Sequence, residues 1–330
     1  MRQKPGLWIS GGRVLTLLPV ICLALLTGPF AALAEAPADP EVQGLYARAQ
    51  KALANGDSET ALQRFQTLAH RHPGTELAAL AVWEISRIQE HSGDHEAAFA
   101  SLNTLIIRYP QHFEKAHNEQ FRVVRRLLDT GKENRRTLEP VRPSQKVDPD
   151  VIATMLQTVI RHGPHSAAGI QAHYYLAIAK EKAGLKQEAI GHYEDFVEAY
   201  PEHELVDDAS YQMAYIPYKE WKASQSSGPR HRESAAIALS YFVARFPESD
   251  KVAQAQSCLS EIRSAELREL RSLARYYASR GNTKAAAVYY EQLAMKFPQV
   301  VIQDSVLRTE ITGAGADVES DHGNAPAKTK

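Results

Sequence analysis

Five aromatic residues occur at one position of a pattern that recurs along this 330-residue sequence: Tyr46, Trp83, Phe121, Tyr174 and Tyr211. The first four lie ten residues before a glycine, and the fifth takes the matching place in "SYQMA", which parallels "YYLA". Aromatic side chains give large contact area at low entropic cost, so an exposed row of them would bind a peptide segment of a partner. The same position would equally serve packing between helices, and both interpretations stay open. Trp83 is the strongest candidate for ligand contact.

The titratable residues predict neither a metal site nor a catalytic site. His91 and His95 flank a glycine, and His162 and His165 flank a Gly-Pro pair, so each pair lies in a turn and not on one helix face. The sequence contains no nucleophile elbow, phosphate-binding loop or dinucleotide fingerprint, and no cysteine pair for zinc. Cys258 is expected to be a small, buried, apolar residue. We therefore expect no enzyme activity, no cofactor and no metal.

Two stretches carry opposite charge. Residues 122–146 hold eight basic and three acidic residues, whereas residues 188–209 hold eight acidic residues and no Lys or Arg. Such patches would steer a protein partner, although a solvated loop and a solvated helix face explain them as well. The whole chain has 38 basic and 39 acidic residues, a formal net charge of −1, which gives no indication of nucleic-acid binding.

The first 34 residues have the layout of a secretory signal. Three basic residues accompany a long apolar run, no acidic residue precedes Glu35, and Ala32-Leu33-Ala34 offers a small-residue cleavage pattern. We expect cleavage before Glu35 and export of the mature chain, with an uncleaved membrane anchor as the alternative. Cys22 follows an isoleucine in the middle of the apolar run, which is a poor context for lipid attachment.

Glycine, alanine and proline recur at fixed distances and define the elements that must position the aromatic residues. A glycine lies 17 residues before each of four prolines, and an alanine lies 12 residues before the same four: Pro73, Pro110, Pro201 and Pro298. Large apolar residues follow each alanine by four and seven positions, which is the stripe of an amphipathic helix. Because proline cannot continue a helix, each unit is predicted as helix, glycine turn, helix and proline stop.

These units resemble the tetratricopeptide repeat. The resemblance implies an all-α fold, a right-handed α-solenoid of about five to six helix pairs whose first helices line a concave surface. We expect a signal peptide at 1–34, the solenoid at 35–302, and a capping segment followed by a disordered tail at 303–330. Surplus residues predict a basic loop insertion at about 132–150, which contains prolines, and one long helix at about 250–280, which contains no helix breaker.

Over about residues 41–300 the chain resembles the BamD-type (YfiO) outer-membrane protein assembly factors, through its Tyr/Phe-Pro stops, its insertion in the third unit and its long helix before "LARYYASRGNTKAAAVYYEQLAMKFP". The resemblance implies a non-catalytic periplasmic scaffold at the inner face of the outer membrane. It would bind the barrel-forming subunit of the β-barrel assembly machinery and unfolded outer-membrane proteins. That family is normally lipidated, so the context of Cys22 is a departure, and membrane association is expected to be indirect.

Two alternative functions are considered. A periplasmic repeat adaptor of the Tol/cell-division type also uses units that end in "YP", but that family usually carries a coiled-coil segment before its repeats. Here the repeats begin within about ten residues of the expected cleavage site, which favours the assembly factor. A hydrolase that uses these repeats as a binding arm would need about a hundred further residues for its catalytic domain.

Overall fold

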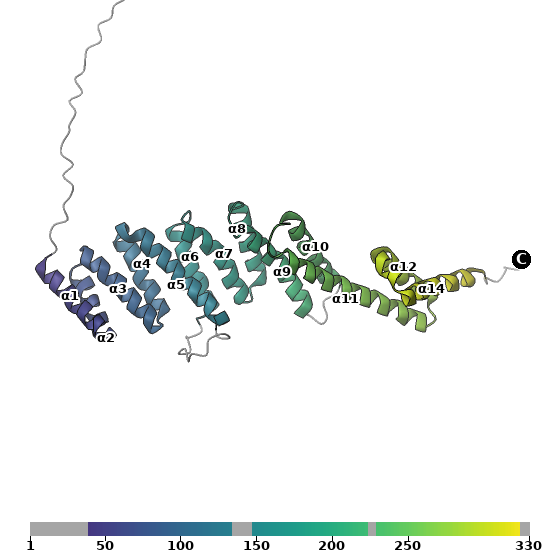
Figure 1. Ribbon diagram of the computed structural model, residues 1–330, viewed down its shortest axis with the longest axis horizontal. Coiled ribbons are helices and arrows are strands. Elements are labelled where there is room, and N and C mark those ends of the chain that lie inside the picture. The colour runs from purple at the N-terminus through teal and green to yellow at the C-terminus, as the bar shows by residue number, and fades with distance from the viewer. Residues whose placement is uncertain (1–38, 134–146, 224–228, 324–330) are drawn as a thin grey trace, which may run out of the picture.

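The computed structural model describes residues 39–133, 147–223 and 229–323, and these residues form helices and short connections without a β-strand. Figure 1 shows an elongated array that runs from α1 at one end to α14 at the other. The helices are α1 Pro40–Ala54, α2 Ser58–Arg71, α3 Glu76–Ser92, α4 His95–Arg108, the 3₁₀ helix η1 Pro110–His112, α5 Phe113–Glu133, α6 Pro149–His162, α7 Ala167–Lys182, α8 Lys186–Ala199, α9 Val206–Ala223, α10 Pro229–Arg245, α11 Val252–Ser279, α12 Thr283–Lys296, α13 Pro298–Gln303 and α14 Ser305–Gly323.

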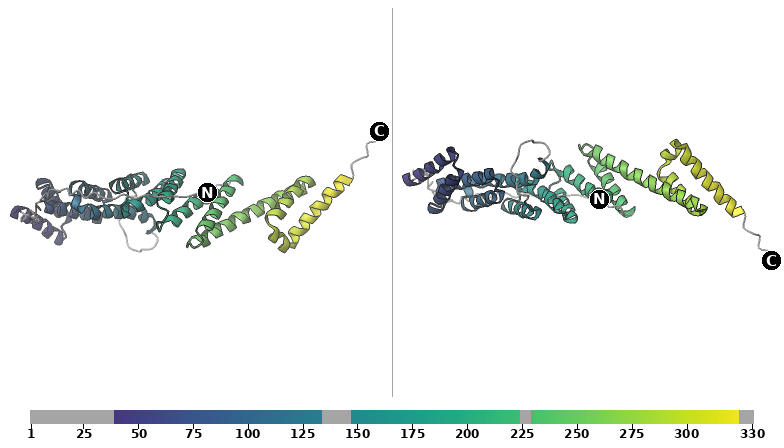
Figure 2. Two further views of the ribbon diagram at one scale, coloured as in Figure 1. Left: turned by 90° about the horizontal axis from the view of Figure 1, so that it is seen from above. Right: turned by 90° about the horizontal axis from the view of Figure 1, so that it is seen from below.

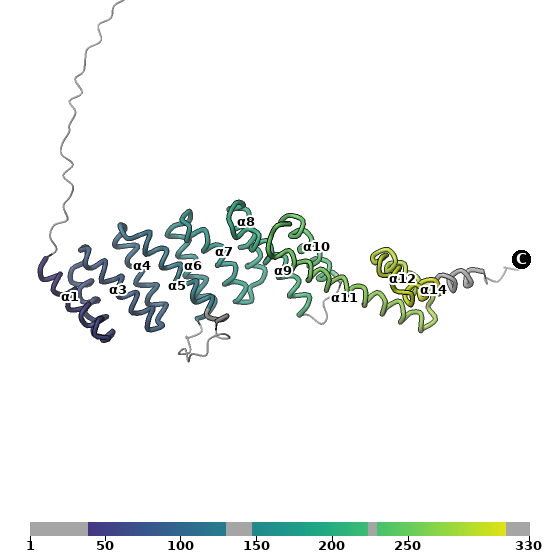
Figure 3. The backbone as a smooth tube through the Cα atoms, in the orientation of Figure 1, coloured from purple at the N-terminus to yellow at the C-terminus, as the bar shows by residue number. Residues whose placement is uncertain are grey.

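Each helix packs against the next one along the chain, so the fold is the α-solenoid that the sequence predicts. In Figure 3 the backbone rises and falls as successive hairpins. The expected signal peptide lies outside the described residues, as does most of the predicted basic insertion.

The glycine turns explain why one long apolar pattern becomes pairs of helices. Gly56, Gly93, Gly184 and Gly281 have φ values of 81°, 86°, 82° and 74°, a region where other residues are strained. The residue after the glycine caps the following helix at three of these turns. For example, the Asp94 carboxylate accepts a hydrogen bond from the Ala97 amide at 3.0 Å. The glycine therefore ends one helix while its neighbour begins the next.

The aromatic–proline pairs end the second helix of a pair, as predicted. Helices α4, α8 and α12 stop immediately before Tyr109, Tyr200 and Phe297, whose amides each bond back to a carbonyl four residues earlier. The following proline has no amide hydrogen and cannot extend the helix.

The regular spacing of small residues allows the helices of a pair to approach closely. Ala61, Ala98, Ala189 and Ala235 are fully buried, and Ala286 is 1% exposed. A larger side chain at such a site would push neighbouring helices apart.

We expect Ala98→Leu to lower the free energy of unfolding by about 1–3 kcal/mol, the usual cost of overpacking a filled core. Thermal melting followed by circular dichroism measures this change. An unchanged melting temperature would contradict the alignment of the repeats proposed from the sequence.

Helix α11 joins two separate cores. Its first half packs with α9 and α10 through Cys258 and Ile262, and its second half packs with α12 and α14 through Leu270 and Ala274. Both views of Figure 2 show α11 as the link between the main stack and the last helices. Its 28 residues cover the range in which the sequence predicts one long helix. An open groove of about 1070 Å³ lies beside its middle, between α10 and the α12–α13 junction.

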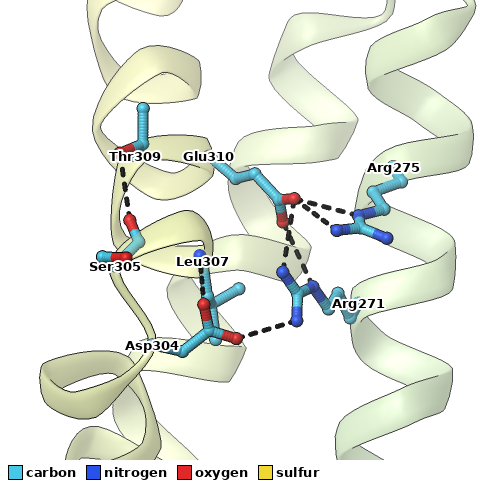
Figure 4. A network of polar contacts seen from close by, with 7 residues as sticks. All are labelled: Arg271, Arg275, Asp304, Ser305, Leu307, Thr309 and Glu310. Atoms are coloured by element: carbon cyan, nitrogen blue, oxygen red, sulfur yellow. Dashed lines mark hydrogen bonds and ion pairs between the residues drawn. The ribbon is translucent and has the colours of Figure 1, made fainter.

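Polar contacts hold the last helix against α11 (Figure 4). Asp304 accepts from the Leu307 amide at 2.9 Å, which caps α14, and from Arg271 Nη1 at 2.9 Å. Glu310 accepts from Arg271 Nε at 3.3 Å and from Arg275 Nε at 3.1 Å. The Leu307 amide and Arg271 together hold the pKa of the Asp304 carboxyl below its usual range.

The described part of the segment expected as a cap and a disordered tail, 303–330, is helical. Helix α14 begins at Ser305 and continues to Gly323. The capped and ion-paired first turns supply the nucleus that a helix needs, after which each added residue costs little. The sequence contains no proline between Pro298 and Pro326 to stop it.

Candidate functional site

The five predicted aromatic residues lie on the first helix of five successive pairs: Tyr46 on α1, Trp83 on α3, Phe121 on α5, Tyr174 on α7 and Tyr211 on α9. The structure divides them by burial. Phe121, Tyr174 and Tyr211 are 7%, 8% and 2% exposed, whereas Tyr46 and Trp83 are half-buried. Only the latter two retain substantial surface for contact with a partner.

The three buried rings contact other aromatic rings. Tyr174 lies 5.7 Å from Tyr193 between ring centroids, and Tyr211 lies 5.4 Å from Phe242. Each of these pairs joins the first helix of a repeat to its second helix. Burial raises the pKa of both tyrosine hydroxyls above the usual value. These residues therefore serve helix packing.

Trp83 combines an apolar surface with a positive charge. Lys115, an exposed residue of α5, places its ammonium 4.0 Å from the centroid of the Trp83 ring. This cation–π distance is well within the range in which an ammonium group is attracted to the ring face. A segment that contacts both residues would offer an apolar group to the indole and a carboxylate to Lys115.

A second set of aromatic residues was missed by the sequence analysis. Tyr175 on α7 and Tyr215 on α9 are half-buried, and each lies beside a cation. The Arg125 guanidinium is 5.5 Å from the Tyr175 ring, and Lys219 Nζ is 5.0 Å from the Tyr215 ring. The signals for them were present, because Tyr175 doubles the repeat aromatic and Tyr215 follows Tyr211 by one helical turn.

Together with Tyr46 and Trp83, these residues form a set that we call the A-helix aromatic set: Tyr46, Trp83, Tyr175 and Tyr215. Each is half-buried and lies on the first helix of a pair. Three of the four have a cationic group within 5.5 Å of the ring centroid. The set could bind apolar and acidic groups of an extended or helical segment.

Ion pairs join first helices of neighbouring repeats. Glu90 on α3 accepts from Arg122 and from Arg126 on α5, each at 2.6 Å. Glu261 on α11 accepts from Tyr218 at 2.7 Å and from Lys222 at 2.8 Å, both on α9. The contacts with Lys222 and Tyr218 lower the pKa of Glu261. Such bonds hold neighbouring repeats in a defined relative orientation.

Buried polar residues join α5 to the last turn of α6. His117, 1% exposed, bonds through Nε2 to the Val159 carbonyl at 2.8 Å. His162 Nδ1 lies 3.1 Å from Oε1 of Gln120, which is fully buried. His162, one of the histidines considered as a ligand, is therefore part of a packing junction. The described residues contain no group of three potential metal ligands.

Three half-buried histidines make stability sensitive to mild acid. Burial is the main cause of a lowered pKa at His95, His162 and His173, and His117 and Arg161 add to it at His162. Above about pH 7.5 these imidazoles are neutral in both states. In the unfolded chain a histidine has a pKa of about 6.5, so as the pH falls through this value the unfolded chain binds protons before the folded protein does. The folded state therefore loses stability until the pH has also passed the lowered pKa values of the folded protein.

We therefore expect the urea midpoint of the protein to be lower at pH 5.5 than at pH 7.5. The carboxylates with lowered pKa values titrate below this window, so they do not produce the difference. His162→Gln should reduce the pH dependence. Equal midpoints of the unsubstituted protein at the two pH values would contradict the prediction.

Comparison with known proteins assigns the chain to a family. Residues 144–313 match the YfiO family, described as an outer membrane lipoprotein, and residues 46–113 match a tetratricopeptide repeat. This chain belongs to the YfiO family. The family match covers α6 to about the first half of α14, and the repeat match runs from within α1 through η1. No curated protein matches the chain.

Solved structures similar to this YfiO-family chain include three repeat proteins. A tetratricopeptide repeat protein of Parabacteroides merdae is 10% identical, with a TM-score of 0.37, over 84% of this chain and 99% of that one. MamA of Desulfovibrio magneticus is 14% identical, with a TM-score of 0.34, over 64% and 98%. A thermophilic TPR protein of Thermus thermophilus is 15% identical, with a TM-score of 0.31, over 66% and 98%.

No helix within the described ranges is both long enough and apolar enough to cross a bilayer. The fold and the family together indicate an envelope protein that binds other proteins.

Proposed function

We propose that this protein is a non-catalytic periplasmic scaffold of the machinery that assembles β-barrel proteins in the outer membrane. It binds the barrel-forming subunit and unfolded segments of the substrates. The observation that carries the proposal is the YfiO family match, which extends over residues 144–313 of a continuous solenoid. The surface also has the chemistry of a protein-binding surface, because half-buried aromatic rings and charged side chains are its prominent features.

The A-helix aromatic set is the proposed contact surface for unfolded segments. Strands destined for a barrel wall are rich in apolar and aromatic side chains, which would pack on half-buried rings such as Trp83 and Tyr215. The cations beside these rings would hold carboxylates of the same segment. The five aromatic positions predicted from the sequence remain part of this proposal, with Phe121, Tyr174 and Tyr211 packing the helices that carry the half-buried rings.

The proposal is tested by affinity purification of the tagged protein from detergent-solubilised envelopes, followed by mass spectrometry. Recovery of a barrel-forming assembly subunit in amounts comparable to the bait is expected. Recovery of Tol components without that subunit would favour the cell-division adaptor and would overturn the proposal. An unrelated exported repeat protein with the same tag serves as the control for non-specific recovery.

A further inference from the structure

A second surface lies between α8 and α10, the second helices of two successive pairs. They flank an open groove of about 570 Å³ whose floor is α9. Met213 and Pro217 lie on the floor, Val197 on the α8 wall, and Tyr241 on the α10 wall. Tyr241 is 61% exposed, although its ring is large and mostly apolar. The volume lies within the range of about 300–1,000 Å³ that is typical of ligand sites.

The floor also offers a polar atom. Pro217 lies inside α9 and has no amide hydrogen, so it cannot donate to the Met213 carbonyl in the regular helical pattern. Both residues line the groove. A hydrogen-bond donor from a ligand could therefore meet a carbonyl oxygen at the base of an otherwise apolar surface.

The α8 rim of the groove is acidic. Glu194 and Glu198 line it, are exposed, and lie four residues apart, which puts both carboxylates on one helix face. Within the described part of the chain neither forms an ion pair, whereas Glu188 on the same helix pairs with Lys180 at 2.8 Å. These two carboxylates are free to pair with a ligand.

The opposite rim does not neutralise this charge. Arg245 on α10 donates to the Tyr241 hydroxyl at 2.9 Å, and its guanidinium lies 5.5 Å from the Phe246 ring. These contacts keep the Arg245 side chain on its own helix. The groove therefore presents an apolar floor between a carboxylate pair and a positioned arginine.

We propose that this groove binds an amphipathic α-helix of a protein partner, whose apolar face enters the groove and whose Lys or Arg side chains pair with Glu194 and Glu198. Helices commonly bind such grooves through apolar residues at positions i, i+3 or i+4, and i+7.

This interface goes beyond the proposed function and does not depend on it. The groove residues Met213 and Pro217 lie on a different face of α9 from Tyr211 and Tyr215, because residues two apart on a helix point in nearly opposite directions. The protein could therefore hold a helical partner and an unfolded segment at the same time.

The test uses two synthetic helical peptides with the same leucine-rich face, one flanked by lysines and the other by glutamates. Each is titrated into the full chain at 150 mM salt, with binding followed by fluorescence anisotropy. The lysine peptide is expected to bind at least tenfold more tightly than the glutamate peptide. Glu198→Lys should weaken binding of the lysine peptide about tenfold and strengthen binding of the glutamate peptide.

Asp195→Lys is the matched control. Asp195 lies on the same helix and is highly exposed, and the substitution changes the net charge equally, but the residue does not line the groove. The affinity of the Asp195→Lys variant for the lysine peptide should stay within twofold of that of the unsubstituted protein. Tyr241→Ala, at an exposed position, should weaken binding of both peptides. Equal effects of Glu198→Lys and Asp195→Lys, or equal binding of the two peptides, would overturn the proposal.

Discussion

Gly169→Ala is expected to lower the melting temperature of the protein by several degrees. A Cβ atom at residue 169 of α7 would overlap the carbonyl oxygen of Gly163 and would lie 2.9 Å from its carbonyl carbon. Both atoms belong to the backbone, which is held by a hydrogen bond from Ser166 Oγ to the Gly163 carbonyl at 2.8 Å. Relief of the clash must move α7 relative to the end of α6, so we expect a loss of about 1–3 kcal/mol or more in the free energy of unfolding.

Gly191→Ala is the matched control because it makes the same chemical change in a helix interior. Nothing lies within 4 Å of a Cβ atom built at Gly191 on α8. Alanine at an unstrained helical position should stabilise the fold by about 0.5–1 kcal/mol, because it loses less conformational entropy than glycine. The two variants should thus shift the thermal midpoint in opposite directions. Shifts of the same sign and size would mean that the close approach of α7 to Gly163 is not as described.

Trp83→Ala is expected to weaken binding of an unfolded barrel protein, or of its terminal peptide, by about 2 kcal/mol or more, the scale of an interface hot spot. The Trp83 ring is half-buried, packs against the hydrophobic core formed by α1 to α5, and has Lys115 beside it. Titration and melting should be measured on the same sample, because truncation of a partly buried ring also removes packing. Loss of affinity by the folded fraction is the predicted result.

Two further variants separate binding from packing at this position. Trp83→Phe keeps most of the volume and should spare stability, and Lys115→Met removes the charge beside the ring while keeping a long, unbranched side chain. If Lys115 holds a carboxylate of the segment, the methionine variant should bind the segment more weakly and with a smaller salt dependence. Reduced stability with unchanged affinity in Trp83→Ala would remove Trp83 from the proposed contact surface while leaving the solenoid intact.

The helix pairs could be predicted because their boundaries depend on local backbone chemistry. Gly93 and Gly184 adopt positive φ, and Pro201 and Pro298 have no amide hydrogen with which to extend the helix before them. Their fixed spacing therefore predicted the repeat, and Ala98 predicted where two helices approach. The end of α14 was predicted less well, because its order depends on contacts of Asp304 and Glu310 with arginines more than 30 residues away in the sequence.

The sequence by itself determined the type of fold and the position of each aromatic residue on a helix, since periodicity and turn residues act over a few neighbours. Only the tertiary structure decided which rings are exposed. Tyr174 and Tyr175 are adjacent, yet the first is buried against α8 and the second faces Arg125 of α5. That difference arises because the exposed surface of a helix is what remains after both neighbouring helices have packed against it, and those neighbours come from different repeats.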